Sequence, residues 1–199
     1  PSLASRQGMT YIHGPATSRQ PRAADVVLYV DLDGVLQSQW VMLHPKQGVY
    51  IWPSRAPGRV LFEWAPILVE VLRPFPEVRC VLSSSWCVRP GYGRTLKRLL
   101  EDLGWRFIGG TYHRCVFGPD VWAEASFREK PRWLQVCEDV NRRKPKRWLA
   151  LDDDVGGWPS WTSQNFIVCD GDLGLSRAQT RALLTERLES VHLDLRAGG

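Results

Sequence analysis

The stretch VDLDGVL contains two aspartates, one residue apart, directly after the apolar run Val26–Val30. If the strand continued, the carboxylates of Asp31 and Asp33 would point to the same side, where like charges repel each other. An aspartate can act as a covalent nucleophile, and a second carboxylate two residues on can donate a proton and later take one up. The pair is therefore a candidate for nucleophilic and acid–base chemistry, provided that a cation offsets the repulsion.

Two further groups of polar side chains also follow apolar runs that are typical of strands. Ser83–Ser85 come directly after Val78–Leu82, and Asp152–Asp154 come directly after Arg147–Leu151. Because the carboxyl ends of parallel strands meet at one edge of an open sheet, we expect all three groups to lie close together there. Several carboxylates in one place require a cation. Their hard oxygen ligands suit Mg2+, which prefers one or two carboxylates plus a substrate phosphate.

A serine and a lysine supply the donors that a phosphoryl group would need. A transferring phosphoryl group spreads negative charge over its oxygens, so fixed hydrogen-bond donors and cations around it do most of the catalytic work. Ser83 offers a hydroxyl group, and Lys130 offers a cation just before a helix expected to begin at Pro131. The combination favours phosphoryl-transfer chemistry at the edge of the sheet.

Strand patterns alternate with helix patterns along the chain, which is typical of an α/β fold with a mostly parallel sheet. The expected strands are Val26–Val30, Val78–Leu82, Trp105–Ile108, Arg147–Leu151 and Asn165–Cys169. The expected helices are Phe62–Arg73, Arg94–Leu103, Pro131–Asn141 and Ser176–Glu189, and the stretch 109–128 fits neither pattern. Two β-prone runs around residues 44–48 predict a hairpin flap at about 37–53. We expect a loosely ordered leader at 1–25 and a single domain at 26–195.

These motifs, in this order, resemble the haloacid dehalogenase-like (HAD) superfamily of phosphohydrolases. The superfamily pattern is a strand ending in Asp-x-Asp, a strand ending in Ser or Thr, a Lys before a helix, and a strand ending in paired acidic residues. The corresponding residues here are Asp31 with Asp33, Ser83, Lys130, and Asp152 with Asp153. The resemblance implies a Rossmann-like three-layer sandwich with little or no cap. It also implies a magnesium-dependent phosphatase that forms an aspartyl-phosphate.

The resemblance implies a role for each acidic residue. Asp31 would be the nucleophile and a Mg2+ ligand. Asp33 would be the general acid and base, with its backbone carbonyl also on the metal. From the acidic triplet, Asp153 is favoured as a further metal ligand, and its neighbour Asp152 is the alternative.

The resemblance assigns the substrate phosphate to two other residues. Ser83 and Lys130 would bind the phosphoryl oxygens, and Lys130 would also restrain the carboxylate of the nucleophile. Arg128 is a competitor for the position of this lysine.

A narrower resemblance rests on segments around the same motifs. Ser-Ser-Trp after the second strand, Trp-Leu-Ala-Leu-Asp-Asp-Asp, and Val-Cys-Asp followed by Gly-Leu-Ser are similar to small bacterial HAD proteins, some of which are modules of RNA repair proteins. In that group a phosphatase for nucleic-acid ends has been inferred by association. Neither interval between motifs has room for a full cap domain, so an open site is expected. Such a site admits a bulky phosphorylated substrate, such as an RNA or DNA end.

Other functions stay open on the sequence alone. One is a nucleic-acid-binding accessory domain with a weak or unused HAD site, in which basic residues after the second motif guide a polyanion; these are Arg89, Arg94, Lys97 and Arg98. Another is a small-molecule phosphatase or phosphotransferase, because the motifs do not fix the acceptor. The ten tryptophans could stack on bases, although packing in the core or at its rim is the more usual role.

Composition sets wider limits on the protein. Its 199 residues, 44% hydrophobic and 24% charged, are typical of one globular domain, and the net charge of +5 favours anionic partners without identifying one. No apolar run of about 18 residues is present, so no membrane span is expected. Five cysteines without a CxxC pair indicate reduced core residues in a cytoplasmic protein. The oligomeric state does not follow from the sequence.

Overall fold

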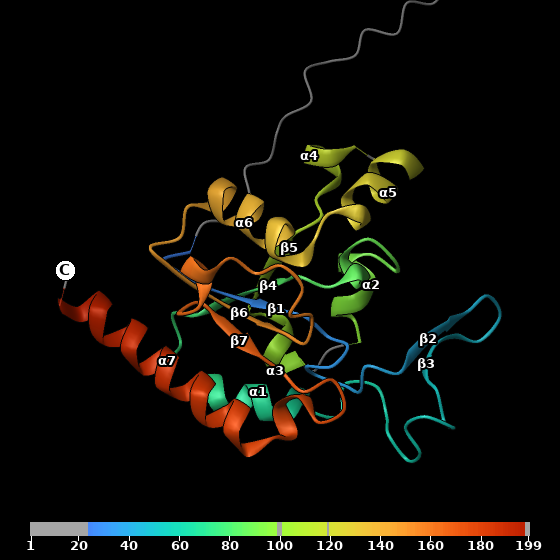
Figure 1. Ribbon diagram of the computed structural model, residues 1–199, viewed down its shortest axis with the longest axis horizontal. Helices are drawn as coiled ribbons and strands as arrows, with labels where there is room; N and C mark the ends of the chain where they lie inside the picture. The colour runs from blue at the N-terminus through green and yellow to red at the C-terminus, as the bar shows by residue number, and fades with distance from the viewer. Residues whose placement is uncertain (1–23, 99–100, 119, 198–199) are drawn as a thin grey trace, which may run out of the picture.

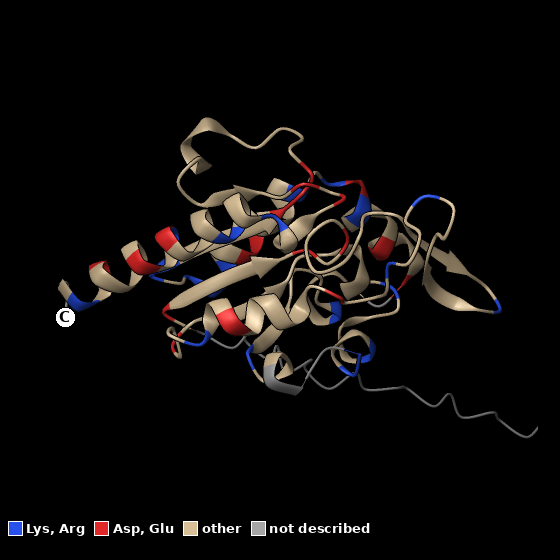
Figure 2. Ribbon diagram, turned by 90° about the horizontal axis from the view of Figure 1, so that it is seen from below, with Lys and Arg blue, Asp and Glu red and all other residues tan. Residues whose placement is uncertain are grey.

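The computed structural model describes residues 24–98, 101–118 and 120–197. The leader expected at 1–25 therefore lies outside the described residues, apart from Ala24 and Asp25. In the described ranges, no helix is both long and apolar enough to cross a membrane. Basic and acidic segments are interspersed along the described ribbon rather than separated into two halves (Figure 2).

A parallel sheet forms the centre of the described structure (Figure 1). Its order is β5–β4–β1–β6–β7, with the bounds β1 Val26–Val30, β4 Arg79–Leu82, β5 Phe107–Gly110, β6 Arg147–Asp152 and β7 Phe166–Val168. Each pair of neighbouring strands is parallel. Every residue of β1 is buried, because this strand lies in the middle of the sheet with helices on both faces. Its continuous apolar sequence follows from that position.

Helices cover both faces of the sheet (Figure 1). One face carries α1 (Ala65–Leu72), α3 (Glu101–Gly104) and α7 (Ala178–Ala197), and the other carries α6 (Arg132–Arg143). Side chains of β1 alternate between the two cores that result. Leu28 belongs to the core that includes Leu68 and Leu184, whereas Tyr29 belongs to the core that includes Val136. The predicted three-layer α/β fold with a mostly parallel sheet is confirmed.

Two expected helices differ from the observed ones. α1 begins at Ala65 rather than at Phe62, because Pro66 suits the first turn and Phe62 has a φ of 60°, outside the helical region. The single helix expected over 94–103 is wrong. Its place is taken by α2 (Tyr92–Leu96) and by α3, and residues 99–100 lie outside the described residues.

Short elements occupy the segments that the hydrophobic pattern left unassigned. The stretch 109–128 contains α4 (Arg114–Phe117) and most of α5 (Val121–Glu129). Single 3-10 turns follow β4, β6 and β7; they are η1 (Ser85–Cys87), η2 (Ser160–Thr162) and η3 (Gly174–Ser176). A single 3-10 turn or a four-residue helix shows too little periodicity to be recognised in a sequence.

A hairpin of β2 (Val41–His44) and β3 (Gly48–Ile51) projects from the carboxyl end of β1 (Figure 1). Its base is fastened to the loop after β7. The side chains of Gln39 and Trp40 both donate to Asp172 Oδ1, at 3.0 and 2.9 Å. The hairpin therefore has a fixed root beside the end of β1, while Leu43 near its tip is exposed.

A buried polar network joins α6 to the centre of the sheet. Asp139 is fully buried and accepts hydrogen bonds from Tyr29 Oη at 3.0 Å, from Arg143 Nε at 2.5 Å and from Arg142. Burial, followed by the charge of Asp139, raises the pKa of Tyr29, so its hydroxyl stays protonated and donates. The network fixes the position of α6 along β1.

Replacement of Asp139 by alanine tests this network. The substitution removes the carboxylate from the side chain of Arg143, which is 1% exposed, and we expect the free energy of unfolding to fall by about 3–5 kcal/mol. Tyr29→Phe removes one hydrogen bond to the same carboxylate and should cost about 1 kcal/mol. Urea unfolding measures both. Equal losses for the two variants would contradict the importance given to the charge of Asp139.

Candidate active site

The strand register brings the predicted motifs to one level of the sheet. Val30, the last residue of β1, lies opposite Leu82 on β4 and Leu151 on β6. The residues that follow continue this pairing, since Asp31 N donates to Leu151 O at 3.0 Å and Ser83 N donates to Val30 O at 2.9 Å. Asp31, Ser83 and Asp152 therefore leave three neighbouring strands side by side.

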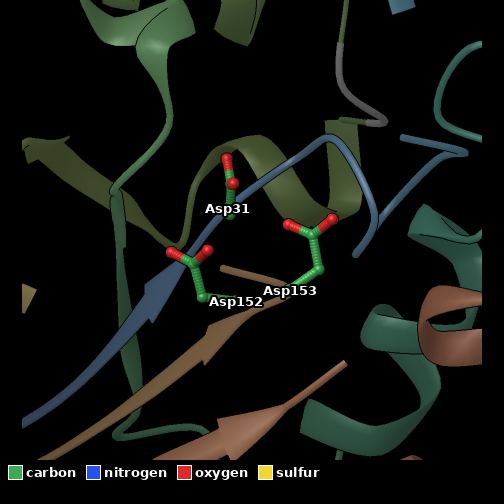
Figure 3. A group of neighbouring side chains, drawn as sticks. All are labelled: Asp31, Asp152 and Asp153. Atoms are coloured by element: carbon green, nitrogen blue, oxygen red, sulfur yellow. The ribbon is translucent and has the colours of Figure 1, made fainter. Parts of the chain in front are cut away.

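Three carboxylates converge at this edge (Figure 3). Asp31, Asp152 and Asp153 each offer an oxygen, and these atoms lie within 4.8 Å of one another. Asp31 and Asp152 are buried and Asp153 is half-buried. Asp154 is exposed and points elsewhere, because its Oδ1 accepts from Gly156 N at 2.8 Å. The geometry thus places the first two residues of the acidic triplet, and not the third, beside Asp31.

The cluster is electrostatically unfavourable by itself. Burial, followed by the charge of Asp31, raises the pKa of Asp153 to about 6 and raises the pKa of Asp152 well above its ordinary value. Two unit charges at this separation repel each other by about 3 kcal/mol at an effective dielectric constant of about 20. A bound cation would remove this cost, and three hard oxygen donors fit Mg2+.

Gly34 permits the close approach of Asp153 to the loop after β1. A Cβ atom on Gly34 would lie 2.2 Å from Asp153 Oδ2, and the φ of Gly34 is +72°, which side chains rarely tolerate. No other residue type fits this position without displacing Asp153. The glycine of VDLDGVL is therefore required for Asp153 to reach its place in the carboxylate cluster.

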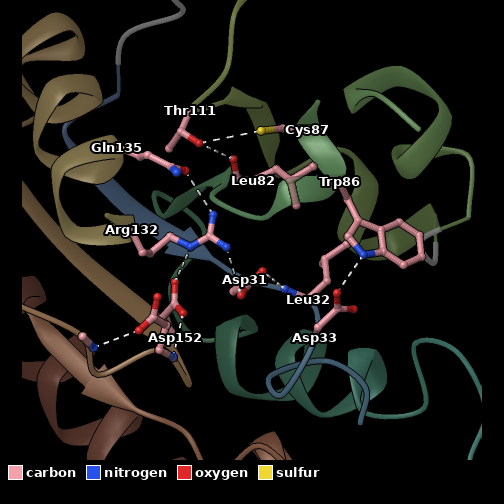
Figure 4. A network of polar contacts seen from close by, with 12 residues as sticks. Asp31, Leu32, Asp33, Leu82, Trp86, Cys87, Thr111, Arg132, Gln135 and Asp152 are labelled. Carbon is pink, nitrogen blue, oxygen red and sulfur yellow. Dashed lines mark hydrogen bonds and ion pairs between the residues drawn. The ribbon is translucent and has the colours of Figure 1, made fainter. Parts of the chain in front are cut away.

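Asp33 lies outside the cluster and has its own partners (Figure 4). Its Oδ1 accepts from Gln37 Nε2 at 2.6 Å, and its Oδ2 accepts from Trp86 Nε1 at 3.1 Å. Gln37 is fully buried and its Oε1 accepts from Phe62 N at 3.0 Å, so the amide is held from both ends. Burial, followed by the charge of Asp31, raises the pKa of Asp33 to about 7. A carboxyl group with this pKa is suited to proton transfer near neutral pH.

The cation nearest the nucleophile candidate is Arg132, which the sequence analysis did not identify (Figure 4). Its Nη2 lies 3.5 Å from Asp31 Oδ2 and its Nε lies 3.2 Å from Asp152 Oδ2. Although burial lowers the pKa of Arg132, the charges of Asp31 and Asp152 outweigh burial and raise it. Gln135, one turn along α6, accepts from Arg132 Nη1 at 3.2 Å. Arg132 therefore enters the site as the first residue of α6.

Lys130 is directed away from the carboxylates. Its Nζ donates to both oxygens of Glu138 at 2.8 Å and lies 5.2 Å from the centre of the Phe117 ring. In the described part of the chain, no ion pair joins Lys130 to Asp31, and Arg128 is exposed on the last turn of α5. The structure thus brings Arg132, and not the predicted lysine, to the place where a cation contacts Asp31.

Two serines directly follow β4, the strand next to β1. Ser83 and Ser84 are buried, and their Oγ atoms have no hydrogen-bond partner among the described residues. Buried polar groups are normally paired, so an unpaired hydroxyl at a sheet edge indicates a place for a ligand atom. The oxygens of a phosphoryl group would satisfy these donors. Ser84 was part of the polar triplet in the sequence but was not singled out.

Of the three tryptophans that the sequence places nearest the site, Trp86 and Trp158 pack against other rings. Trp86 is buried, packs edge-on against Phe62 and donates to Asp33. Trp158 stacks on Phe166 with ring centres 4.0 Å apart. Trp161 is 65% exposed and is the one of these three with an open ring.

The parallel sheet and the carboxylate cluster at the end of β1 define a HAD-like domain. Residues 27–180 match the model of the family described as the HAD domain in Swiss Army Knife RNA repair proteins. The match covers most of the chain, so the protein belongs to this family, and the resemblance drawn from its motifs is confirmed. Among curated proteins, the comparison finds no match.

The exchange Gly34→Ala tests the carboxylate cluster as a metal site. We expect Mg2+ to raise the unfolding temperature of the unmodified protein, because a ligand that binds the folded state stabilises it. In Gly34→Ala the displaced Asp153 should abolish most of this rise. Gly58→Ala is the matched control: the φ of Gly58 is +75°, but its Cβ would meet nothing within 4 Å. Thermal unfolding with and without Mg2+ measures the difference, and equal Mg2+ effects in both variants would contradict the role of Asp153.

Proposed function

We propose that the protein is a magnesium-dependent phosphatase that hydrolyses a phosphate monoester through an aspartyl-phosphate on Asp31. The observation that carries this proposal is the separation of two carboxylates into different surroundings. Asp31 lies beside a guanidinium group and two further carboxylates, whereas Asp33 is held by Gln37 and Trp86. Unpaired serine hydroxyls follow the neighbouring strand β4. Membership of the HAD family supports phosphatase chemistry at the level of the superfamily.

The two carboxylates divide the reaction between them. An oxygen of Asp31 attacks phosphorus while the bond from phosphorus to the ester oxygen breaks, and protonated Asp33 gives its proton to the leaving alcohol. Asp33, now a carboxylate, then takes a proton from water as the water oxygen attacks phosphorus. Phosphate leaves, the Asp31 carboxylate is regenerated and Asp33 again holds a proton. The raised pKa of Asp33 favours the protonated form needed in the first step.

Mg2+ would be held by Asp31, Asp153 and Asp152, with the backbone carbonyl of Asp33 as the further ligand that the family resemblance implies. When bound, the ion supplies positive charge that offsets the carboxylates and the phosphoryl oxygens. Arg132 and the hydroxyls of Ser83 and Ser84 would stabilise the remaining negative charge on the phosphoryl group. A planar guanidinium group with several donors suits both a carboxylate and phosphoryl oxygens.

The proposed substrate is a phosphorylated nucleic-acid end, and RNA is favoured. The family is described by its place in RNA repair proteins, and the net charge of +5 favours an anionic partner. In the described residues, the intervals between the strands that carry the motifs hold a short hairpin and short helices, not a cap domain. An open site of this kind suits a large substrate. The five free cysteines support the proposal that the protein works in the cytoplasm.

Replacement of Asp31 by asparagine tests the nucleophile. We expect Asp31→Asn to reduce Mg2+-dependent hydrolysis of p-nitrophenyl phosphate below detection, because the amide is not a nucleophile. Asp194→Asn, which alters an exposed aspartate on α7, should keep the activity of the unmodified protein. Release of p-nitrophenol measures turnover. Retained turnover in Asp31→Asn would show that another residue attacks the phosphate.

A second comparison separates the two cations near the start of α6. We expect Arg132→Leu to lower kcat for p-nitrophenyl phosphate by about 10²- to 10³-fold, the usual effect of removing a donor that stabilises developing negative charge. Lys130→Met should lower kcat by less than about threefold, because Lys130 pairs with Glu138. Circular dichroism checks that both variants fold. A larger loss in Lys130→Met than in Arg132→Leu would restore the lysine to the site.

A further inference from the structure

A second hollow lies beside the proposed active site, between α2 and the edge strand β5. This α2–β5 pocket has a volume of about 1060 Å3, and its walls include Pro90, Arg94, Lys97, Trp105 and Arg114. The volume is at the upper end of the range of about 300–1,000 Å3 that is typical of small-molecule sites. It therefore offers room for more of a substrate than its phosphate.

The pocket shares a wall with the active site. Within η1, Trp86 donates to Asp33 Oδ2, and the next residue, Cys87, lines the pocket. Thr111 lies against this turn, with its Oγ1 3.8 Å from Cys87 Sγ, and the following Tyr112 lines the pocket. Because β4 lies between β1 and β5, the pocket lies on the β4 side of Asp31. A substrate bound at Asp31 would have the α2–β5 pocket as a neighbour.

The charged side chains that line the pocket are all basic. They are Arg94, Lys97, Arg114 and Arg143, and no Asp or Glu of the described residues is in the lining. Arg114 pairs with Glu124, and Arg143 pairs with Asp139. Arg94 and Lys97 are exposed, lie three residues apart on and just after α2, and form no ion pair with the described side chains. Two cations at this spacing share one face of a helix and suit successive phosphates of a chain.

An aromatic side chain lies in the same wall. Trp105 is 55% exposed, and its ring centre lies 5.0 Å from the guanidinium carbon of Arg79 and 4.7 Å from that of Arg106. Both guanidinium groups lie over this ring, and more than half of the residue is still exposed. Aromatic rings combined with cations are typical of sites for single-stranded nucleic acid, in which bases stack on rings and cations follow the backbone. An acidic peptide would use the cations but has no counterpart for the indole ring.

We propose that the α2–β5 pocket binds the nucleotides of a single-stranded RNA chain next to its terminal phosphate, which lies at Asp31. The proposal rests on the proposed phosphatase function for its orientation, and it adds the subsite that selects the substrate. The pocket would lower the KM for an oligonucleotide and would leave a small aryl phosphate unaffected.

A charge series at Gly93 tests the pocket without removing any existing contact. Gly93 lines the pocket, its φ is outside the positive region, and a Cβ there would meet nothing within 4 Å, so larger residues fit. We expect Gly93→Glu to weaken binding of a single-stranded RNA with a terminal phosphate on the order of tenfold relative to Gly93→Gln, and Gly93→Lys to strengthen it. Fluorescence anisotropy measures binding, and RNAs with 3′- and 5′-phosphates are both used.

Removal of the two exposed cations is the complementary measurement. The double variant Arg94→Gln with Lys97→Gln should reduce the slope of log Kd against log salt by about 1.4, since each contact with a single strand contributes about 0.7. The control is Arg187→Gln with Arg196→Gln on α7, which changes the net charge equally on another part of the molecule. This control should keep the salt slope of the unmodified protein.

Turnover separates this proposal from the proposed function. The Gly93 variants should differ in kcat/KM for the phosphorylated RNA on the order of tenfold and agree within about twofold for p-nitrophenyl phosphate. If the unmodified protein hydrolyses neither substrate, the phosphatase proposal fails, and the anisotropy series still decides whether the pocket binds RNA. Equal RNA affinities across the Gly93 series would overturn the pocket proposal. An equal or larger effect on a phosphopeptide would overturn it in favour of a protein substrate.

Discussion

The repulsion between carboxylates at the end of β1 is the constraint that organises the rest of the site. Asp31, Asp152 and Asp153 leave adjacent strands at one level because the strands are parallel and in register. Arg132 compensates one of the charges, whereas burial, followed by the charge of Asp31, raises the pKa values of Asp152 and Asp153. A divalent cation would neutralise the negative charge that remains. In the proposed function, the cost of assembling the cluster would be the source of its affinity for Mg2+.

Asp33 escapes this constraint although it is only two residues from Asp31. Gly34, with its positive φ, turns the chain directly after Asp33, and Gln37 and Trp86 take its carboxyl group into a separate pair of hydrogen bonds. The repulsion between Asp31 and Asp33 is therefore reduced by the separate placement of their side chains as well as by nearby positive charge. Asp31 contacts the guanidinium group of Arg132 and a backbone donor, whereas Asp33 is held where its carboxyl group can stay protonated.

The sequence predicts the parts of the site that depend on strand order, but it does not show which partner a charged side chain takes. Apolar runs followed by polar residues placed Asp31, Ser83 and Asp152 correctly at one edge, because parallel strands leave few alternatives. Lys130 and Arg132 flank one proline, and both are cations near the same helix start. Only the three-dimensional position of Glu138, six residues after Arg132 on α6, shows that Lys130 is engaged elsewhere. No sequence pattern indicates which of Lys130 and Arg132 contacts Asp31.

The helix α6 links the stability of the fold to the chemistry at the sheet edge. Arg132 and Asp139 are seven residues apart, about two turns or 10 Å along the helix. Their partners are Tyr29 on β1 and Asp31 just after it, two residues apart and about 7 Å along the chain direction. Two contacts at these spacings fix both the position of α6 and its rotation about its own axis. A shift of α6 by one residue would break both contacts together. The buried network around Asp139 therefore holds Arg132 at Asp31, even though Asp139 itself lies outside the site.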